Sequence, residues 1–318
     1  MGFLNFRTFR LSNTRSTIFM KSKIVFFSFF VITLSGQLFG QVSEKPKTTS
    51  YKIQFDYLSD YIYNGRADSI KYPYQITTAS VNFANGVYIN LGADYLLTQG
   101  EKRFDFFQLD LGYEFELDKK WTGSVYGTKF FYSSQSALLN GNISTDFGAN
   151  MNYDAGFIQL NNSLDVFFAN KADLQWTVGF EKDFTSEKNN QKWSFDPGVY
   201  ANISSLNYYE SEVTRRLRPK NPAIKAATPI NVISTTKTNQ TGLKLMALEC
   251  SFPISYENEH FGFSIYPTYA IPYNAISTTT TIKNQANNNT INTVNSTPYS
   301  ERNLQNRWYV QAGIFLKF

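Results

Sequence analysis

The chain alternates between apolar and polar positions along most of its length. The segment 307–318 gives the simplest case, because its apolar residues share one parity: Trp308, Val310, Ala312, Ile314, Leu316 and Phe318. Successive side chains of a β-strand point to opposite faces, so this pattern predicts a strand with one apolar face. No amphipathic helix pattern of useful length appears, and the sequence therefore predicts an all-β fold.

Twelve segments carry strand-like patterns. Their approximate bounds are 51–63, 74–84, 87–97, 103–117, 121–133, 143–153, 157–168, 174–184, 193–204, 242–254, 260–273 and 307–318. The parity slips near Ala247, which predicts a β-bulge in the tenth segment. Asn85-Gly86 predicts a two-residue hairpin turn in which both positions need a positive φ.

The connections between these segments are alternately short and long. Short connections lie near 85–86, 118–120, 154–156, 185–192 and 255–259, and longer ones near 64–73, 134–142, 205–241 and 274–306. Transmembrane antiparallel β-barrels have this rhythm, with short turns on the periplasmic side and long loops outside. The sequence predicts such a barrel of about 12 strands, with ten or fourteen as alternatives. A soluble β-sandwich is the competing interpretation.

Aromatic residues near the strand ends fit the barrel. Trp121, Trp193 and Phe318 would lie at periplasmic ends, and Trp176 and Trp308 at outer ends. Membrane proteins carry aromatic girdles at both interfaces.

The first forty residues predict export. Segment 20–40 has a charged start at Met20-Lys21-Ser22-Lys23, an apolar run over 24–34 and small residues before Gly40. This is the pattern of a secretory signal peptide, and its apolar run is too short for a spanning helix. We expect cleavage after Gly40 and a single barrel domain over 41–318. Segment 1–19 is either a mis-called upstream extension or a long charged region of the signal.

Removing the signal changes the charge argument. The chain has 30 Lys+Arg and 25 Asp+Glu, but residues 1–40 hold five basic residues and no acidic ones. The exported chain therefore carries 25 of each sign. The sequence pI of about 9.0 reflects the targeting segment, and we expect no nucleic-acid partner.

Residues that could carry catalysis are sparse. Cys250 and His260 are the only residues of their types, and no metal-ligand cluster or phosphate-cradling glycine loop is visible, so no cofactor is predicted. An outer-membrane hydrolase would need a Ser and a His near the outer lipid boundary, whereas His260 falls at a predicted periplasmic turn. Glu114 and Glu116 could form a hydrolase's carboxylate pair, but the polarity of a lumen is the favoured explanation. We expect no enzyme.

If the apolar parity faces lipid, the other parity lines the lumen. The carboxylates expected inside are Asp94, Asp110, Glu114, Glu116, Asp146, Asp165, Glu181 and Asp196, against few basic residues such as Lys52 and Lys317. Carboxylate rings favour cations, and a 12-strand barrel is wider than an eight-strand barrel that side chains can fill. These features predict a narrow, cation-preferring channel. The alternative is a filled interior in which the carboxylates pair with Lys and Arg.

The two long outer connections suggest a surface role. Connection 205–241 contains basic residues that could contact lipopolysaccharide phosphates: Arg215, Arg216, Arg218, Lys220 and Lys225. Connection 274–306 is rich in Thr and Asn and could extend strands beyond the membrane. An adhesin or receptor would use these connections as a binding surface, whereas a porin could fold one inward as a constriction.

Two stretches resemble known outer-membrane proteins. The apolar strand ending in Phe318 resembles the closing strand of Gram-negative outer-membrane barrels, where the barrel-assembly machinery reads that end. Segment 59–65, Ser-Asp-Tyr-Ile-Tyr-Asn-Gly, and Gly86-Val87-Tyr88 are similar to stretches early in the TorF-type porin family. The similarity covers about the first fifth of the exported chain, together with the Phe terminus and the overall size, and the Asn-, Tyr- and Phe-rich composition resembles a Bacteroidota version.

The resemblance implies an outer-membrane porin for passive diffusion of small solutes. Its expected partners are outer-membrane lipid, lipopolysaccharide, the barrel-assembly machinery and small solutes. Connections 205–241 and 274–306 depart from the family and leave the solute open, as the sequence leaves the oligomeric state.

Overall fold

The computed structural model describes residues 48–318 except 68–69, 99, 101, 134–135, 137–142, 170, 206, 208–210, 218–229, 239–241 and 298–303. Its strands are β1 (Ser50–Leu58), β2 (Tyr74–Asn82), β3 (Val87–Leu96), β4 (Arg103–Glu116), β5 (Trp121–Tyr132), β6 (Thr145–Asp154), β7 (Gln159–Phe168), β8 (Ala172–Glu181), β9 (Phe184–Lys188), β10 (Gln191–Phe195), β11 (Gly198–Ser204), β12 (Ser211–Leu217), β13 (Ile230–Thr238), β14 (Lys244–Ser251), β15 (Ile254–Glu257), β16 (Phe261–Pro272), β17 (Thr278–Asn284), β18 (Thr290–Ser296) and β19 (Arg307–Lys317). Among these residues no helix is long and apolar enough to cross a membrane.

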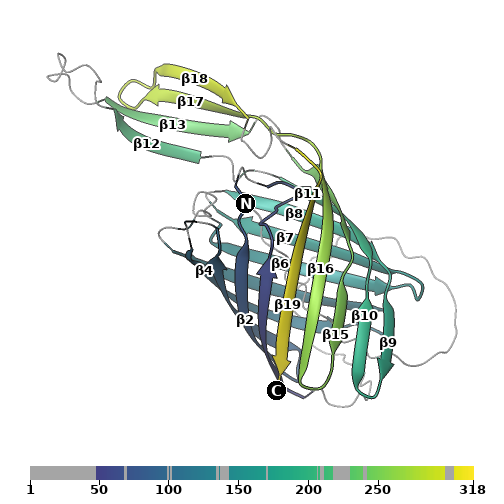
Figure 1. Ribbon diagram of the computed structural model, residues 1–318. Coiled ribbons are helices and arrows are strands. Elements are labelled where there is room, and N and C mark those ends of the chain that lie inside the picture. Colours follow the sequence, from purple (N-terminus) through teal and green to yellow (C-terminus); the bar gives the residue numbers. More distant parts are fainter. Residues whose placement is uncertain are drawn as a thin grey trace, which may run out of the picture. The chain divides into compact units, whose positions relative to one another are not determined.

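Twelve of these strands close into one antiparallel barrel (Figure 1). The ring runs from β1 through β8 in sequence order, then β11, β14, β16 and β19, and β19 pairs back to β1. Pairing of β14 with β16 completes the ring. The predicted all-β class, the antiparallel barrel and the count of twelve are confirmed.

Three barrel strands are interrupted and resume after a short break. Strands β9, β10 and β15 continue β8, β11 and β14 beyond three short breaks. The break at Lys182-Asp183 has no proline, whereas the other two contain Pro197 and Pro253. Proline has no N–H to donate to a ladder, but its carbonyl still accepts. The amide of Lys182 donates to the carbonyl of Pro197 at 3.0 Å, and that of Asp196 donates to Pro253 at 3.1 Å. The wall therefore stays hydrogen-bonded across these breaks.

This continuation corrects two predicted connections. Segment 185–192 is mostly the β9–β10 hairpin, whose tight turn is Asn189-Asn190 with φ of 52° and 61°. Segment 255–259 begins within β15. The Asn85-Gly86 turn forms as predicted, but only Gly86 has a positive φ. The carbonyl of Phe83 accepts a bond from the Gly86 amide at 3.0 Å, so the turn needs one left-handed residue rather than two.

The predicted slip near Ala247 is a bulge. In the β11–β14 pair, Asn202 is opposite Ala247 and Ile203 is opposite Leu245, which leaves Met246 as the extra residue. Met246 and Ala247 are both fully buried. A second bulge lies in β4, where Asp94 pairs with Phe106 but Tyr95 pairs with Phe104.

The two faces of the barrel wall differ as the alternation predicts. Apolar residues of the predicted lipid-facing parity are exposed: Leu91, Phe107, Leu109, Leu111, Phe131, Leu164, Phe180, Ile314 and Leu316 among others. Polar residues of the other parity are buried, including Asp56, Asp94 and Asp146. The apolar surface is thus on the outside of the ring and the polar surface inside.

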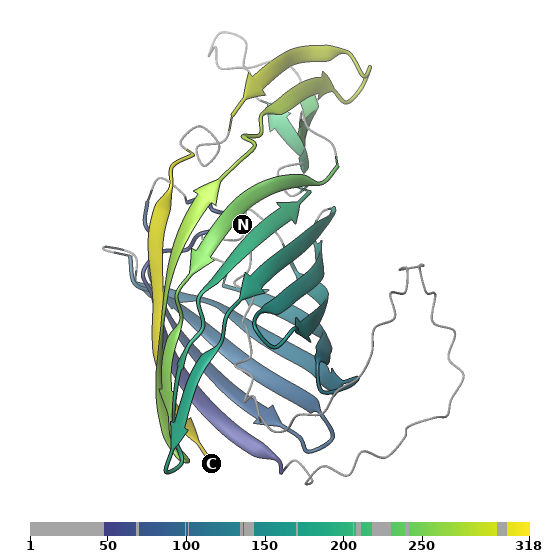
Figure 2. The same ribbon diagram turned by 90° about the vertical axis from the view of Figure 1, so that its right-hand side faces the viewer.

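The two long connections form a sheet of their own. It has the order β12-β13-β17-β18, and it appears as pale green and yellow-green strands in Figure 2. Pairing of β13 with β17 joins connection 205–241 to connection 274–306, and the hydroxyls of Thr236 and Thr280 lie 2.9 Å apart across that pair. The sequence gives no sign that the two connections pair with each other. Both link strands at the same end of the barrel, since each follows a strand that runs in the same direction.

Candidate functional site

The inward face of the barrel carries a band of carboxylates. Asp94, Asp146 and Asp165 are buried, and Asp110 accepts bonds from the Asn90 amide at 2.8 Å and the Thr128 hydroxyl at 3.3 Å. These side chains come from strands β3, β4, β6 and β7. Asp165 likewise accepts from the hydroxyls of Tyr126 and Ser163. Asp94 and Asp146 each bury one oxygen that has no hydrogen-bond partner among the described residues.

The other predicted lumen carboxylates are more exposed to solvent. Glu114 and Glu116 are exposed to water near the end of β4, and Asp196 is half-buried in the break between β10 and β11. Glu181 is half-buried and accepts a hydrogen bond from the Tyr200 hydroxyl. All eight predicted residues therefore have the inward parity, and their role in lining a pore stays a prediction.

Some lumen residues were missed by sequence analysis. Asp105 is fully buried because the bulge in β4 turns it inward, out of step with the alternation. Asp173 is also buried, and it lies one residue before the predicted start of its strand. Asp56 shares the parity of Lys52, so the alternation could have identified it. Lys192 and Glu257 lie in strands that were predicted as turn or strand end.

A continuous row of polar side chains crosses the wall at right angles to the strands. Register partners on neighbouring strands from β19 to β6 make up the row: Lys317, Lys52, Ser80, Asn90, Asp110, Thr128 and Asp146. The row begins with lysines near the chain terminus and ends with carboxylates. Barrel strands tilt against the axis, so such a row also climbs along the lumen.

Glycines let large lumen side chains lie flat against the wall. Tyr88, Tyr126 and Tyr200 are the register partners of Gly112, Gly148 and Gly179, and each ring occupies the space that a Cβ on its glycine would fill. The Tyr126 hydroxyl donates to Asp165. These pairs cover the bare backbone and keep the rings from projecting toward the barrel axis.

Segment 59–67, between β1 and β2, folds against the inward face at one end of the barrel. Ile62 packs with Ala67 and Ala270, and Tyr63 packs with Met246 and Ile276. The turn at Asn64-Gly65 has positive φ at both residues. A Cβ at Gly65 would lie 3.0 Å from the Cβ of Ala247 and 3.3 Å from Pro272, so only glycine allows this approach.

Arg66 fastens this segment to β14 and to the residues after β16, and these two strands lie three and two strands from β1 around the ring, respectively. Its guanidinium is buried and donates to the carbonyls of Asn64 (2.7 Å), Met246 (2.9 Å), Tyr273 (2.5 Å) and Asn274 (3.2 Å). Hydrogen bonds from a charged donor are stronger than neutral ones, so these bonds hold the segment firmly.

The same segment also contacts strands on the other side of β1. The Tyr61 ring meets Tyr74 edge-on with 6.0 Å between centroids, and Tyr74 meets Phe106 at 6.3 Å. The Tyr74 hydroxyl donates to Asp105 at 2.6 Å. Segment 59–67 therefore reaches from β2 and β4 to β14 and β16. It lies at the end of the barrel where β1 finishes. The sequence had suggested a long connection folded inward, not this segment, as the element that could constrict the lumen.

Asp60 is a buried carboxyl in segment 59–67. Burial raises the pKa of its carboxyl above the ordinary range, while the Tyr72 amide, which donates at 3.0 Å, and the Lys71 and Arg307 charges act the other way. The carboxyl therefore holds its proton more readily here than it would in water.

The remaining candidates stay at the surface. His260 is exposed in the turn between β15 and β16, where its amide donates to Asn258 Oδ1 at 2.9 Å. Cys250 is a free, half-buried thiol in β14. Arg218, Lys220 and Lys225 lie outside the described residues, as do the predicted signal peptide and segment 1–19.

Comparison with known proteins gives similarity of structure only. No protein-family model and no curated protein matches the chain. A NanC porin structure is 12% identical with a TM-score of 0.41, over 84% of this chain and 100% of that one. A Salmonella typhi OmpF complex with daunomycin is 8% identical (TM-score 0.28; 85% and 97% covered), and an anion-selective porin from Comamonas acidovorans is 7% identical (TM-score 0.23; 85% and 99% covered).

These values carry no argument about what this chain does. The barrel is established by the chain's own strand pairing. The resemblance to the TorF-type family and to a Bacteroidota version stays a prediction.

Proposed function

We propose that this chain is a porin-like channel of a Gram-negative outer membrane, through which small solutes diffuse passively. The observation that carries the proposal is a closed 12-strand barrel with an apolar outer face and a polar, carboxylate-rich inner face. A closed barrel satisfies all of its backbone groups within lipid, and an apolar outer face matches the hydrocarbon. A soluble protein would expose no such belt.

Cation preference is part of the proposal. Carboxylates on β3, β4, β6, β7 and β8 face the lumen, and lysines face it from β1, β10 and β19. A surplus of negative charge along a narrow path attracts cations and repels anions. Segment 59–67 is the proposed constriction, so we expect a low conductance.

We further propose that Phe318 serves as the assembly signal. Phe318 is exposed, and its amide and carbonyl pair with Tyr51 at 3.0 and 3.2 Å, so the last residue is already part of the closed ring. Outer-membrane lipid and lipopolysaccharide are the expected surroundings. Deleting Phe318 should slow membrane assembly in a Gram-negative host, which pulse-labelling of the heat-modifiable folded form would measure.

Planar-bilayer recording tests the channel. Residues 41–318 are refolded and inserted, and currents are recorded in a salt gradient. We expect stepwise currents with a reversal potential on the cation side. A folded barrel that stays silent would overturn the proposal, and circular dichroism with heat-modified mobility serves as the control for folding.

The second candidate is a non-conducting scaffold that binds at the cell surface. The separate sheet β12-β13-β17-β18 favours it, because pairing between two long connections gives them a defined surface. Deleting residues 278–296 should abolish surface binding to lipopolysaccharide while the barrel stays folded. No loss of binding in that variant would remove this candidate.

A further inference from the structure

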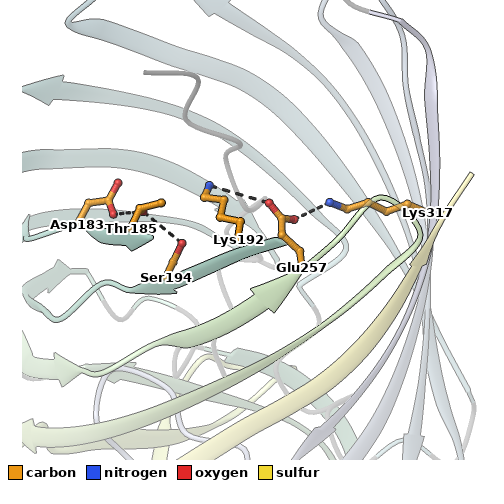
Figure 3. Close-up of polar contacts among 6 residues, drawn as sticks. All are labelled: Asp183, Thr185, Lys192, Ser194, Glu257 and Lys317. Atoms are coloured by element: carbon orange, nitrogen blue, oxygen red, sulfur yellow. Dashed lines mark hydrogen bonds and ion pairs between the residues drawn. The ribbon is translucent and has the colours of Figure 1, made fainter. Parts of the chain in front are cut away.

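Four charged side chains gather at the end of the lumen that is opposite the constriction. They come from different strands: Lys52 (β1), Lys192 (β10), Glu257 (β15) and Lys317 (β19). The Nζ of Lys317 lies 2.5 Å from one oxygen of Glu257, and the Nζ of Lys192 lies 4.0 Å from the other. Figure 3 shows both lysines pointing at this one carboxylate. We call these four residues the lysine cluster.

The cluster has more positive than negative charge. Glu257 is shared by two lysines, and Lys52 makes no ion pair or hydrogen bond with any residue that the structure describes. The nearest acid on its own strand, Asp56, is held by the Gln54 amide at 2.9 and 2.8 Å. Three ammonium groups therefore face two carboxylates, Glu257 and the already hydrogen-bonded Asp56, which leaves an excess of positive charge.

The positions of the lysines make this excess unfavourable without a ligand. Lys52 and Lys317 are direct register partners, and like charges opposite each other destabilise a strand pair. Each Nζ lies 5.4 Å from the centroid of the Phe315 ring, which offsets part of the repulsion. Phe315 lies flat because its partner is Gly262, so the ring forms a floor beneath the two ammonium groups.

We infer that the lysine cluster is a binding subsite for an oxyanion group, carboxylate or phosphate, on a solute inside the lumen. The inference rests on the proposed channel and adds the class of solute that it favours. Charge-assisted hydrogen bonds from two or three ammonium groups would hold one such group. The polar row leads from Lys317 and Lys52 to Asp110 and Asp146, so a small solute with both an oxyanion and an ammonium group meets partners of both signs.

A purely structural role for the cluster makes a different prediction. Lys192, Glu257 and Lys317 could simply brace strands β10, β15 and β19. Lys52 takes no part in that bridge, so Lys52→Gln separates the two roles. In the subsite role the variant loses oxyanion affinity while its stability stays equal or rises, because a like-charge pair has been removed. In the bracing role the same relief of repulsion applies, but no oxyanion affinity is lost.

The test uses the full chain folded in detergent, with inorganic phosphate as the probe in equilibrium dialysis at low ionic strength. Wild type should bind phosphate saturably, and Lys52→Gln should weaken this binding about tenfold. Lys119→Gln, in the exposed turn 118–120, is the matched control and should bind as wild type does. No saturable binding by wild type, or equal affinity in Lys52→Gln, overturns the inference. Heat-modified mobility verifies folding of each variant.

Competition identifies the solute class. The zwitterion tetraglycine is about 14 Å long when extended, which matches the three strand spacings from Lys52 to Asp110. It should displace phosphate at lower concentration than N-acetyl-tetraglycine does, because its ammonium group reaches Asp110. Equal displacement of phosphate by the two compounds would overturn the assignment to zwitterionic solutes. In nanodiscs, anionic phospholipid that displaces phosphate would assign the cluster to a lipid headgroup instead of a solute, which also overturns the inference.

Dialysis separates this inference from the channel proposal. A barrel that is silent in bilayers but binds phosphate through Lys52 supports the subsite and overturns the channel. A barrel that conducts but does not bind phosphate supports the channel and overturns the subsite.

Discussion

At the scale of single residues, Arg66 ties together stretches of chain that are far apart in sequence. It donates to a carbonyl in its own turn, to one in β14 and to two after β16. The flat, forked guanidinium can serve several acceptors at once, whereas a lysine ammonium acts as a point charge. The attachment of segment 59–67 thus combines four charge-assisted hydrogen bonds from one side chain with the apolar contacts around it.

Replacing Arg66 should loosen the constriction. Arg66→Lys keeps the charge but loses the fork, and we expect segment 59–67 to lose about 2 kcal/mol or more of its attachment. Trypsin should then cut at the exposed Lys71 faster, and single-channel conductance should rise. Arg103→Lys, at a lumen arginine outside the segment, is the control. Unchanged proteolysis and conductance in Arg66→Lys would show that apolar packing alone holds the segment.

The tyrosine–glycine pairs give a second prediction at this scale. In Gly112→Ala the new Cβ collides with the ring of Tyr88, which must leave the wall and project into the lumen. We expect a loss of about 1–3 kcal/mol in stability from this overpacking, measured by urea unfolding of the folded barrel. The double variant Gly112→Ala/Tyr88→Ser should recover most of it. No recovery would mean that backbone strain, not the ring, is the cause.

At the scale of elements, local pattern predicted the barrel strands well. Segment 121–133 alternates poorly in the sequence, but the other barrel strands have the expected parity because each half-exposed strand carries its own alternation. Even the bulge at Met246 was visible as a slip. Segment 59–67 was missed because its inward packing depends on Ala247, Ala270 and Pro272, small or constrained residues nearly 200 positions away. The pairing of β13 with β17 could not be predicted for the same reason. The local sequence of a polar strand does not indicate which other polar strand it pairs with.

The β13–β17 register can be tested with an engineered disulfide. Thr236 and Thr280 are opposite each other with hydroxyls 2.9 Å apart, close enough for cysteines in their place to bond. In a Cys250→Ser background, Thr236→Cys/Thr280→Cys should oxidise to a cross-link that proteolysis with and without reductant detects. Thr236→Cys/Ile282→Cys, shifted by two residues, is the control and should stay reduced. Equal cross-linking of both pairs would contradict a fixed register.

At the scale of the whole molecule, the charge inside the barrel is unevenly spread. The exported chain is formally neutral, yet its lumen gathers carboxylates on β3, β4, β6, β7 and β8, and its lysines gather on β1, β10 and β19. Overall charge therefore says little about what the lumen attracts. The carboxylates that face water, rather than the buried ones, are those that an ion in transit can meet, because a desolvated and hydrogen-bonded carboxylate is already committed to protein partners.

Reversing the charge of two such carboxylates should change ion selectivity. Glu114 and Glu116 are exposed on the inward parity of β4. Glu114→Lys/Glu116→Lys turns two negative charges into two positive ones along the path. The reversal potential in a salt gradient should therefore shift toward the anion side, and the shift should shrink at high salt because screening shortens the range of these charges. Glu259→Lys, in the exposed turn between β15 and β16, is the matched control and should leave the potential near that of wild type. If the control shifts it as far as the double variant does, the surface potential at the mouth sets selectivity, and the lumen carboxylates do not.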